Sequence, residues 1–414
     1  MNADLLITGI TQLVTPKGSG PKYGAQMREI TVLEHAAIAV AEGRFLWTGA
    51  AREWTGTAAR RVDLGGHAVI PGLIDPHTHA IWAGDRLRDF DARTSGITYE
   101  DILAAGGGIW STIRATTDDA DDTLVSLTEQ RLWSLIRSGA TTIEVKSGYG
   151  FTVQGELRLL ELIRTVSTRV PVRVVPTLLI HLPPKDMGQH DAYIEQVRHE
   201  LIPEVARRHL ATAVDVFVEK EAWNATQAET ILTSALKHNL GVKVHAEQFH
   251  SIGGLETAIR MKALSIDHLE ACKPHQYSLF QGAPTVATIL PGVSLHLGIP
   301  KAPARQLIDA GAAVAVGTDL NPGSSPLFSV SAALGLAVRL NGLATVEALT
   351  AGTVNACHAL GLDDAGRIEP GARADFVVID SPDWRDLLYT LGNNPVREVW
   401  CKGNRIVPEI RGRA

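Results

Sequence analysis

Eight short apolar runs of strand length recur through the middle of the chain, and longer segments of helical period separate them. The runs are AVIPGLIDPHTH (68–79), ATTIEVKSGYG (140–150), VRVVPTLLIH (172–181), AVDVFVE (213–219), VKVHAEQ (242–248), ALSIDHLE (263–270), TVATILPGVSLH (285–296) and AVAVGTDLN (313–321). Strands that alternate with helices, such as those expected at 119–137 and 154–166, indicate repeated βα units. Eight is the number that closes a (β/α)8 barrel, so we predict an α/β fold of the TIM-barrel type.

Both ends of the chain are rich in predicted β-structure instead. The segment 36–49 has the pattern of a hairpin that turns at Glu42 and Gly43, and 396–407 has the pattern of another around Gly403. Each end has too few strands for a core of its own. We therefore expect one small β-sandwich domain from residues 1–64 and 364–414, with the barrel formed by residues 65–363.

Composition excludes several classes of partner. The formal net charge of -6 and an aromatic content of 5% argue against nucleic-acid binding. No apolar run approaches the roughly 20 residues that a membrane helix needs, and the first residues lack the pattern of a signal peptide. Three cysteines without CxxC spacing cannot form a disulfide framework. A cytoplasmic protein that acts on a small molecule, without membrane or nucleic acid, is the expectation.

Histidine and aspartate stand where four of the eight strands end. In a (β/α)8 barrel the chemistry lies at the carboxyl ends of the strands. His77 and His79 are two residues apart, so both side chains point the same way, and His245 and Asp319 end the fifth and eighth runs. Three imidazoles and one carboxylate suit one Zn²⁺ or iron ion and leave a position for water. His268 ends the sixth run beside this predicted metal site.

Longer motifs resemble the imidazolonepropionase family of the amidohydrolase superfamily over nearly the whole chain. The stretches that carry the resemblance are IPGLIDPHTHAIWAGDR (70–86), AAGGGIWSTIRAT (104–116), TTIEVKSGYG (141–150), HLPP (181–184), VKVHAEQF (242–249), IDHLE (266–270) and GTDLNPGSS (317–325). VKSGYG and TDLNPGSS are the specific motifs, because HxH and PGxID occur across the superfamily. The resemblance implies histidine degradation, with 4-imidazolone-5-propanoate hydrolysed to N-formimidoyl-L-glutamate, and a homodimer.

The same resemblance implies roles for individual residues. Asp319 is expected to accept a proton from the attacking water as well as to bind the metal, and His268 to donate to the developing oxyanion. Gln248, where some members carry glutamate, is expected to take part in catalysis and to contact the substrate ring. The other expected substrate contacts are Arg86 for the propionate carboxylate, Tyr149 and His181 for the ring, and Asn321, Gly323 and Ser324 for the far wall.

Three alternatives remain at this point. An aminohydrolase that deaminates a nucleobase-like ring would use the same ligands, and a barrel without catalysis would serve as a binding scaffold. The third alternative is a site with two metal ions bridged by a carboxylated lysine. Two lysines raise it, because Lys220 lies near the end of the fourth run and Lys146 lies in the second run. Neither lysine is included in the predicted metal site.

Overall fold

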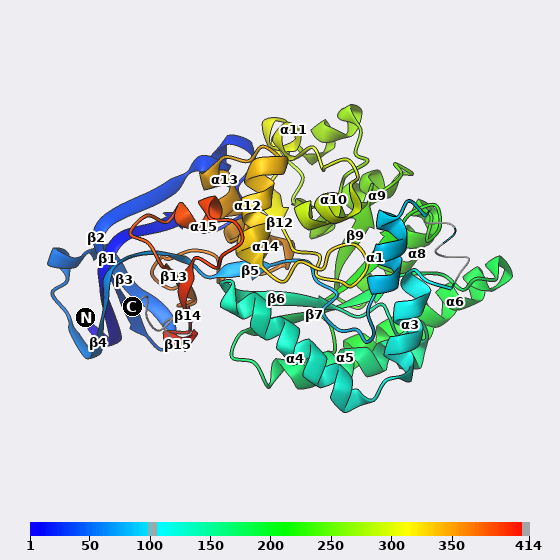
Figure 1. Ribbon diagram of the computed structural model, residues 1–414, viewed down its shortest axis with the longest axis horizontal. Coiled ribbons are helices and arrows are strands. Elements are labelled where there is room, and N and C mark those ends of the chain that lie inside the picture. The colour runs from blue at the N-terminus through cyan, green and yellow to red at the C-terminus, as the bar shows by residue number, and fades with distance from the viewer. Residues whose placement is uncertain (98–100, 102–105, 408–414) are drawn as a thin grey trace.

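The computed structural model describes residues 1–97, 101 and 106–407 of the chain, and eight parallel strands form its larger sheet (Figure 1). Their order is β12-β11-β10-β9-β8-β7-β6-β5, which is chain order throughout. The strands are β5 (Leu73–Asp75), β6 (Ala140–Lys146), β7 (Arg173–Ile180), β8 (Ala213–Val218), β9 (Gly241–Ala246), β10 (Ser265–His268), β11 (Val286–Ile289) and β12 (Val314–Val316). Each of the eight predicted runs contains one of these strands or, for β9, all but its first residue, so the barrel prediction is confirmed.

The run 285–296 was predicted as one strand but contains a strand and a helix. Only Val286–Ile289 of the segment 285–296 is a strand, and Pro291–Leu297 is helix α10. Pro291 occupies the first turn of the helix, where its missing N–H costs nothing. An apolar run that crosses from strand to helix without a polar break gives no periodicity that separates the two.

Helices connect the strands and cover the outside of the barrel. The two helices predicted from periodicity are present as α4 and α5. The helices before the C-terminal strands are α1 (Leu87–Thr94), α3 (Ile109–Asp118), α4 (Asp121–Arg137), α5 (Val153–Ser167), α6 (His190–Gln196), α7 (Ile202–Arg207), α8 (Ala225–Lys237), α9 (Gly254–Arg260), α10, α11 (Ala304–Asp309), α12 (Val330–Leu340), α13 (Thr345–Ala351) and α14 (Val354–Ala359). None of the helices in the described residues is long and apolar enough to cross a membrane.

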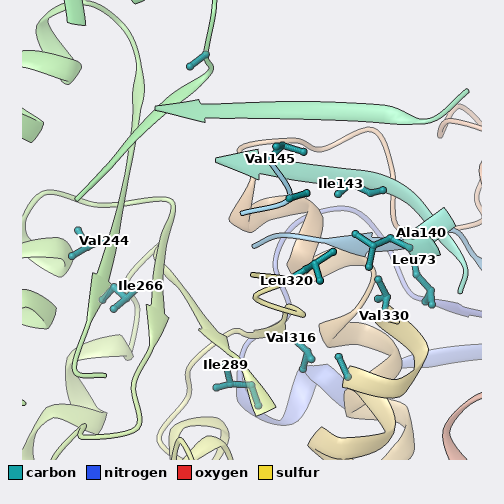
Figure 2. Packing of buried hydrophobic residues seen from close by; sticks show 14 of the residues in the cluster. Leu73, Ala140, Ile143, Val145, Val244, Ile266, Ile289, Val316, Leu320 and Val330 are labelled. Atoms are coloured by element: carbon teal, nitrogen blue, oxygen red, sulfur yellow. The ribbon is translucent and has the colours of Figure 1, made fainter. Parts of the chain in front are cut away.

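Apolar and charged side chains alternate at the carboxyl end of β6. Ile143 and Val145 belong to the apolar cluster that packs against the helices (Figure 2). Glu144 and Lys146, at the alternate positions of β6, are fully buried and contact charged side chains of other barrel strands. Because successive side chains of a strand point to opposite faces, the barrel has an apolar outer layer and charged groups in its interior.

The first and last strands of the barrel are joined just beyond their carboxyl ends. The Asp75 carboxylate accepts hydrogen bonds from the Thr318 amide at 3.0 Å and the Thr318 hydroxyl at 2.6 Å. Farther out, the Asp319 amide donates to the His77 carbonyl and the His79 amide donates to the Leu320 carbonyl, each at 3.0 Å. The seam of the barrel therefore lies among the predicted metal ligands.

A second, mixed sheet combines strands from both ends of the chain, at one end of the molecule in Figure 1. Its order is β15-β14-β13-β4-β1-β2-β3, from β1 (Asn2–Pro16), β2 (Ile30–Ala41), β3 (Arg44–Ala50), β4 (Thr57–Pro71), β13 (Phe376–Ile379), β14 (Val396–Cys401) and β15 (Asn404–Val407). The short helix α15 (Asp386–Tyr389) lies between β13 and β14.

Apolar side chains from both ends of the chain share one core in this sheet. Ile7 and Ile38 from the first strands pack in one cluster with Phe376 and Trp400 from the last. The hairpins also have the predicted turns: Glu42 and Gly43 join β2 to β3 with φ of 53° and 72°. Neither end could build this core alone. The domain boundaries at 64/65 and 363/364 stay a prediction.

Candidate metal centre and active site

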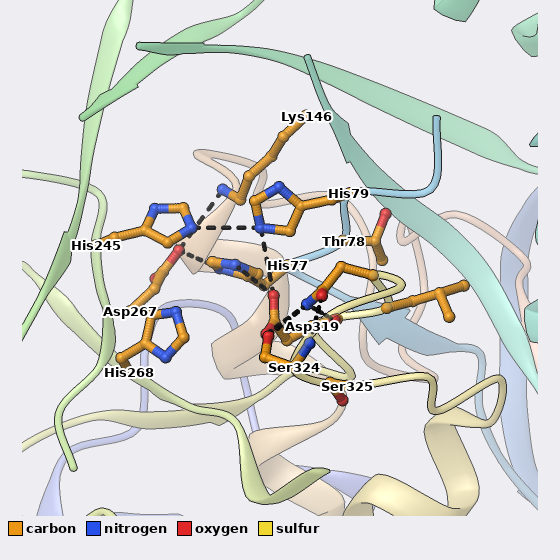
Figure 3. Close-up of polar contacts among 12 residues, drawn as sticks. His77, Thr78, His79, Lys146, His245, Asp267, His268, Asp319, Ser324 and Ser325 are labelled. Atoms are coloured by element: carbon orange, nitrogen blue, oxygen red, sulfur yellow. Dashed lines mark hydrogen bonds and ion pairs between the residues drawn. The ribbon is translucent and has the colours of Figure 1, made fainter. Parts of the chain in front are cut away.

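The four predicted metal ligands converge on one point at the mouth of the barrel (Figure 3). Asp319 Oδ1 lies 3.3 Å from His77 Nε2 and 3.3 Å from His79 Nε2. His245 Nε2 lies 3.4 Å from His79 Nε2. All four side chains are buried. Residues from the loop after β5, from β9 and from the loop after β12 thus form a single cluster, as the strand-end pattern predicts.

The ring orientation of two of these histidines is set by buried carboxylates. His77 Nδ1 lies 2.6 Å from Asp267 Oδ2, and His245 Nδ1 lies 3.0 Å from Asp215. Each Nδ1 donates its proton to the carboxylate, so Nε2 is the atom directed at the cluster. Neither His77 Nε2 nor Asp319 Oδ1 has a hydrogen-bond partner among the described residues. Two buried polar atoms that face each other at 3.3 Å without a well-formed hydrogen bond fit a shared cation, and the site therefore suits a metal ion.

The charges of the site act on the histidine pKa values in two directions. Burial lowers the pKa of His245 well below its ordinary value and also lowers that of His79, which favours the neutral form that binds metals. Burial and Lys146 act in the same direction on His77, but Asp267 and Asp319 raise its pKa to about 9. A metal ion held by these residues would bind the neutral form of His77 in place of the Nε2 proton.

Asp319 is held by the loop that follows it. Asn321 Nδ2 donates to Asp319 Oδ2 at 2.8 Å, and Ser324 Oγ donates to the same oxygen at 3.1 Å. Asn321 Oδ1 accepts hydrogen bonds from the amides of Gly323 and Ser324. The side chain of Asn321 therefore holds the turn that follows it. These three residues were predicted as substrate contacts, and that role stays a prediction. In the structure, Asn321 and Ser324 bind only Oδ2 of the Asp319 carboxylate, so Oδ1 faces the histidines.

His268 stands beside the four ligands. One of its ring nitrogens lies within 4.8 Å of ligand atoms of His77 and Asp319. Its Nδ1 is 3.4 Å from Glu270 Oε2, and both side chains are nearly fully buried. His268 and Leu269 have φ of 89° and 74°, a left-handed conformation that is strained for residues with a β-carbon. The strand thus bends sharply where His268 turns toward the metal centre.

Tyr149 and His181 lie on the other side of the metal centre. The His181 ring stacks on His79 with centroids 5.7 Å apart, and Tyr149 is 6.1 Å from His79 and 5.9 Å from His181. Burial, with a smaller effect of His79, lowers the pKa of His181 to about 3, so its ring is neutral. Burial raises the pKa of the Tyr149 hydroxyl, which therefore keeps its proton.

The loop that contains Tyr149 is ordered by Glu156 on α5. Its buried carboxylate accepts from the amides of Gly148 at 2.7 Å and of Gly150 and Phe151 at 2.8 Å. The chain also passes close to itself here, because a β-carbon on Gly150 would lie 2.2 Å from the Gly155 carbonyl carbon. A glycine is required at that contact.

Arg86 lies near the turn after Asp319. An added β-carbon on Gly323 would be 3.4 Å from Arg86 Nη1, so the guanidinium lies over that glycine. Arg86 Nε donates to Asp89, whose same oxygen accepts from the Gly108 amide at 3.0 Å. The guanidinium is thus oriented by one carboxylate while its Nη1 donates to Thr112 Oγ1 at 3.3 Å. The predicted motif 104–116 begins outside the described residues.

Gln248 lies in the turn just after β9, and it is buried. Its turn is held by Glu219, which accepts from the amides of Phe249 at 3.0 Å and His250 at 3.1 Å. Lys220, the predicted alternative for a bridging lysine, is exposed, and its amide donates to Glu219. The structure does not bring Lys220 to the four ligands.

Sequence analysis considered Lys146 only as an alternative bridging lysine and missed the network of buried charges beneath the ligands. Lys146 Nζ lies 2.7 Å from both Glu144 and Asp215, and Lys243 Nζ lies 2.8 Å from Glu144. Burial opposes ionisation of Lys146, but Asp215, Glu144 and Asp267 outweigh it and raise its pKa. A signal was available: a charged residue in the middle of an apolar strand is costly unless it is paired.

Comparison with known proteins agrees with this fold. Residues 68–414 match the model of the amidohydrolase family. The solved structures of similar fold include a zinc-bound adenosine deaminase from Xanthomonas campestris, with a TM-score of 0.74, 19% identity and coverage of 99% of this chain and 94% of the other. Another is the atrazine chlorohydrolase from Arthrobacter aurescens complexed with zinc, with a TM-score of 0.73, 18% identity and coverage of 99% and 97%.

A (β/α)8 barrel with a histidine and aspartate cluster at its mouth defines a hydrolase of the amidohydrolase class. Imidazolonepropionase from Deinococcus deserti is 56% identical over 403 residues, which cover 97% of this chain and 100% of the relative. Imidazolonepropionase from Deinococcus radiodurans is 54% identical over 404 residues, which cover 98% and 100%. The chain belongs to the imidazolonepropionase family of amidohydrolases.

Proposed function

We propose that this protein hydrolyses the ring amide of 4-imidazolone-5-propanoate to N-formimidoyl-L-glutamate, a step in histidine degradation. The observation that carries the proposal is the 56% identity to an imidazolonepropionase over 97% of the chain. The convergence of His77, His79, His245 and Asp319 supports it. Likeness to the adenosine deaminase, at 19% identity, extends to the fold alone.

One Zn²⁺ or iron ion per subunit is proposed as the cofactor, held by His77, His79, His245 and Asp319. Three imidazoles and a carboxylate suit either metal, and two fold neighbours were solved with zinc. Such an ion lowers the pKa of a bound water toward neutrality and so supplies a nucleophile. Elemental analysis of the purified protein distinguishes the two metals.

The side chains of this protein then handle the proton and the charge. Water attacks the ring carbonyl carbon, and Asp319 accepts the proton that the water loses. His268 donates a hydrogen bond to the oxygen that becomes negative. When the ring C–N bond breaks, Asp319 returns the proton to the leaving nitrogen, and the carbonyl carbon becomes a carboxylic acid, which loses its remaining proton to solvent. Gln248 is proposed to hold the ring through its amide.

The substrate is proposed to lie between Arg86 and the aromatic side of the site. Arg86, oriented by Asp89, binds the propionate carboxylate. Neutral His181 and protonated Tyr149 offer hydrogen-bond donors to the ring oxygen or nitrogens. Asn321, Gly323 and Ser324 form the opposite wall. Arg86 is the residue that favours an anionic substrate over an uncharged nucleobase.

The test is a paired assay on the metal-loaded protein with 4-imidazolone-5-propanoate. We expect the ring absorbance to disappear without release of ammonia, and we expect a chelator to abolish the reaction until metal is restored. Ammonia release from a nucleobase-like ring would favour the deaminase alternative instead. A metal-loaded protein that leaves both kinds of substrate intact would favour a binding scaffold.

We also propose that the protein is a cytoplasmic homodimer. Three free, buried cysteines accord with a reducing compartment. The dimer follows from the family resemblance, and the mass of the native protein in solution tests it.

A further inference from the structure

Two carboxylates that orient metal-binding histidines meet at a single ammonium group. Lys146 Nζ lies 2.7 Å from Asp215 Oδ2 and 3.6 Å from Asp267 Oδ2. Asp215 is the partner of His245 Nδ1, and Asp267 is the partner of His77 Nδ1. Lys146, Asp215 and Asp267 are all inaccessible to solvent. The mechanism proposed above does not use any of them.

We propose that Lys146 is a positioning residue for the metal centre, which holds Asp215 and Asp267 together so that His245 and His77 present Nε2 to the ion. The inference rests on the metal site of the proposed function, but it does not depend on the substrate. Figure 3 shows the position of Lys146 relative to the ligands.

The chemistry of the ammonium group fits this role. A lysine has three N–H donors, and Lys146 faces three carboxylates: Glu144, Asp215 and Asp267. Asp215 and Asp267 carry like charges at positions inaccessible to solvent, where their repulsion is strong. Without the ammonium between them, the two carboxylates repel each other and one of them turns away. The histidine that it orients then loses its acceptor, and its ring is free to rotate.

Lys243 and Glu144 belong to the same buried network but do not connect the two aspartates. They make it possible to distinguish a positioning role of Lys146 from a general contribution to packing. Lys243 Nζ contacts Glu144 and the Pro76 carbonyl and approaches Asp267, but it is not paired with Asp215. Glu144 bonds to both lysines and to Thr177 and is not itself paired with a metal-binding histidine. Glu144→Gln is therefore the matched control, since it changes the buried charge network and leaves Lys146 beside both aspartates.

The experiment measures Zn²⁺ affinity by competition with a chromophoric chelator, and the visible spectrum of the Co²⁺-loaded protein. The variants are Lys146→Met, the charge-balanced pair Lys146→Met with Glu144→Gln, and Glu144→Gln alone. For both variants that lack Lys146 we expect a loss of Zn²⁺ affinity of about 10- to 100-fold and an altered Co²⁺ spectrum. For Glu144→Gln we expect a Zn²⁺ affinity within about threefold of the wild-type value and the wild-type Co²⁺ spectrum.

Folding of each variant is checked by circular dichroism and thermal unfolding. Wild-type Zn²⁺ affinity and Co²⁺ spectrum in a folded Lys146 variant would overturn the inference. So would an equal loss in Glu144→Gln, or failure of both Lys146 variants to fold, because Lys146 would then serve the fold and not the ligands. A wild-type protein that binds no metal would instead refute the proposed function.

Discussion

The side-chain amide of Asn321 binds Asp319 Oδ2 at 2.8 Å, on the opposite side of the carboxylate from the oxygen that faces His77 and His79. Asn321→Ala removes this donor and the acceptor that closes the turn. We expect metal affinity, measured without substrate, to fall by about 10- to 100-fold. Ser324→Ala removes one longer hydrogen bond to the same oxygen and should have a smaller effect. Unchanged metal affinity in Asn321→Ala would show that the turn does not position Asp319.

His79→Ala removes one of the four converging side chains. We expect metal content and activity to be lost together, because three remaining ligands bind the ion less tightly. His181→Ala is the control: its ring stacks on His79 but is outside the cluster, so metal should be retained while substrate binding weakens. Elemental analysis measures the metal content of each variant, and the ring-opening assay on the same samples measures its activity. Full turnover by metal-free His79→Ala would exclude the mechanism.

Arg86→Ala removes the proposed partner of the propionate carboxylate. KM should rise by a factor that corresponds to roughly 2–4 kcal/mol of binding free energy, while the metal content stays that of wild type. Arg88→Ala changes an exposed arginine two residues along the chain and serves as the control. The comparison requires steady-state kinetics with the propionate substrate. An unchanged KM in Arg86→Ala would show that another residue binds the propionate carboxylate of the substrate.

Glu156→Ala leaves three amides of the Tyr149 loop without their acceptor. Each buried amide left unpaired costs about 1–3 kcal/mol, so the free energy of unfolding should fall and KM should rise as Tyr149 loses its position. Glu156→Gln keeps one acceptor oxygen and is expected to lie between Ala and wild type. Urea unfolding and kinetics measure the two effects. A wild-type KM in Glu156→Ala would show that the position of the Tyr149 loop does not affect substrate binding.

Glu347 stabilises the fold in a pH-dependent way. Burial alone would raise its pKa, but the Ala344 amide, Arg305 and Arg28 lower it below the ordinary value of 4.5. The carboxylate therefore contributes stability above about pH 4.5, and this contribution is lost as the pH falls through the lowered pKa of the folded state.

Glu347→Gln should consequently reduce the free energy of unfolding by about 1–3 kcal/mol at pH 7 and by progressively less in acid. Urea unfolding between pH 7 and the acid limit of the fold measures the difference from wild type. Glu53→Gln, at an exposed position, is the control with no expected effect. A difference that grows as the pH falls would contradict the assignment.

Much of the fold follows from local pattern. The barrel strands are short apolar runs bounded by polar turns, and the hairpin at Glu42 and Gly43 needs two residues of positive φ. Less predictable was the end of β11, because the apolar run continues into α10 across Pro291. The hydrogen bonds between Asp75 and Thr318 were out of reach too, since they join residues 243 positions apart.

The convergence of His77, His79, His245 and Asp319 was predictable because each of them follows or ends a barrel strand, and their role as metal ligands stays a proposal. The site was not predictable where a residue acts through a partner on another strand. Lys146 and Asp215 are 69 residues apart, and only closure of the barrel places them at 2.7 Å. Asn321 illustrates a third case: its type suits a substrate contact, but its hydrogen bonds to Asp319 depend on the conformation of the turn.

The seam between β5 and β12 sets an order of events for the newly made chain. His77 and His79 leave the ribosome early, but the residues to which their backbone bonds, His77 to Asp319 and His79 to Leu320, are synthesised some 240 positions later. A nascent polypeptide that stops short of this last strand has imidazoles without their carboxylate. The full set of three imidazoles and one carboxylate therefore exists only after synthesis has passed Asp319, so tight metal binding belongs to the late stages of folding.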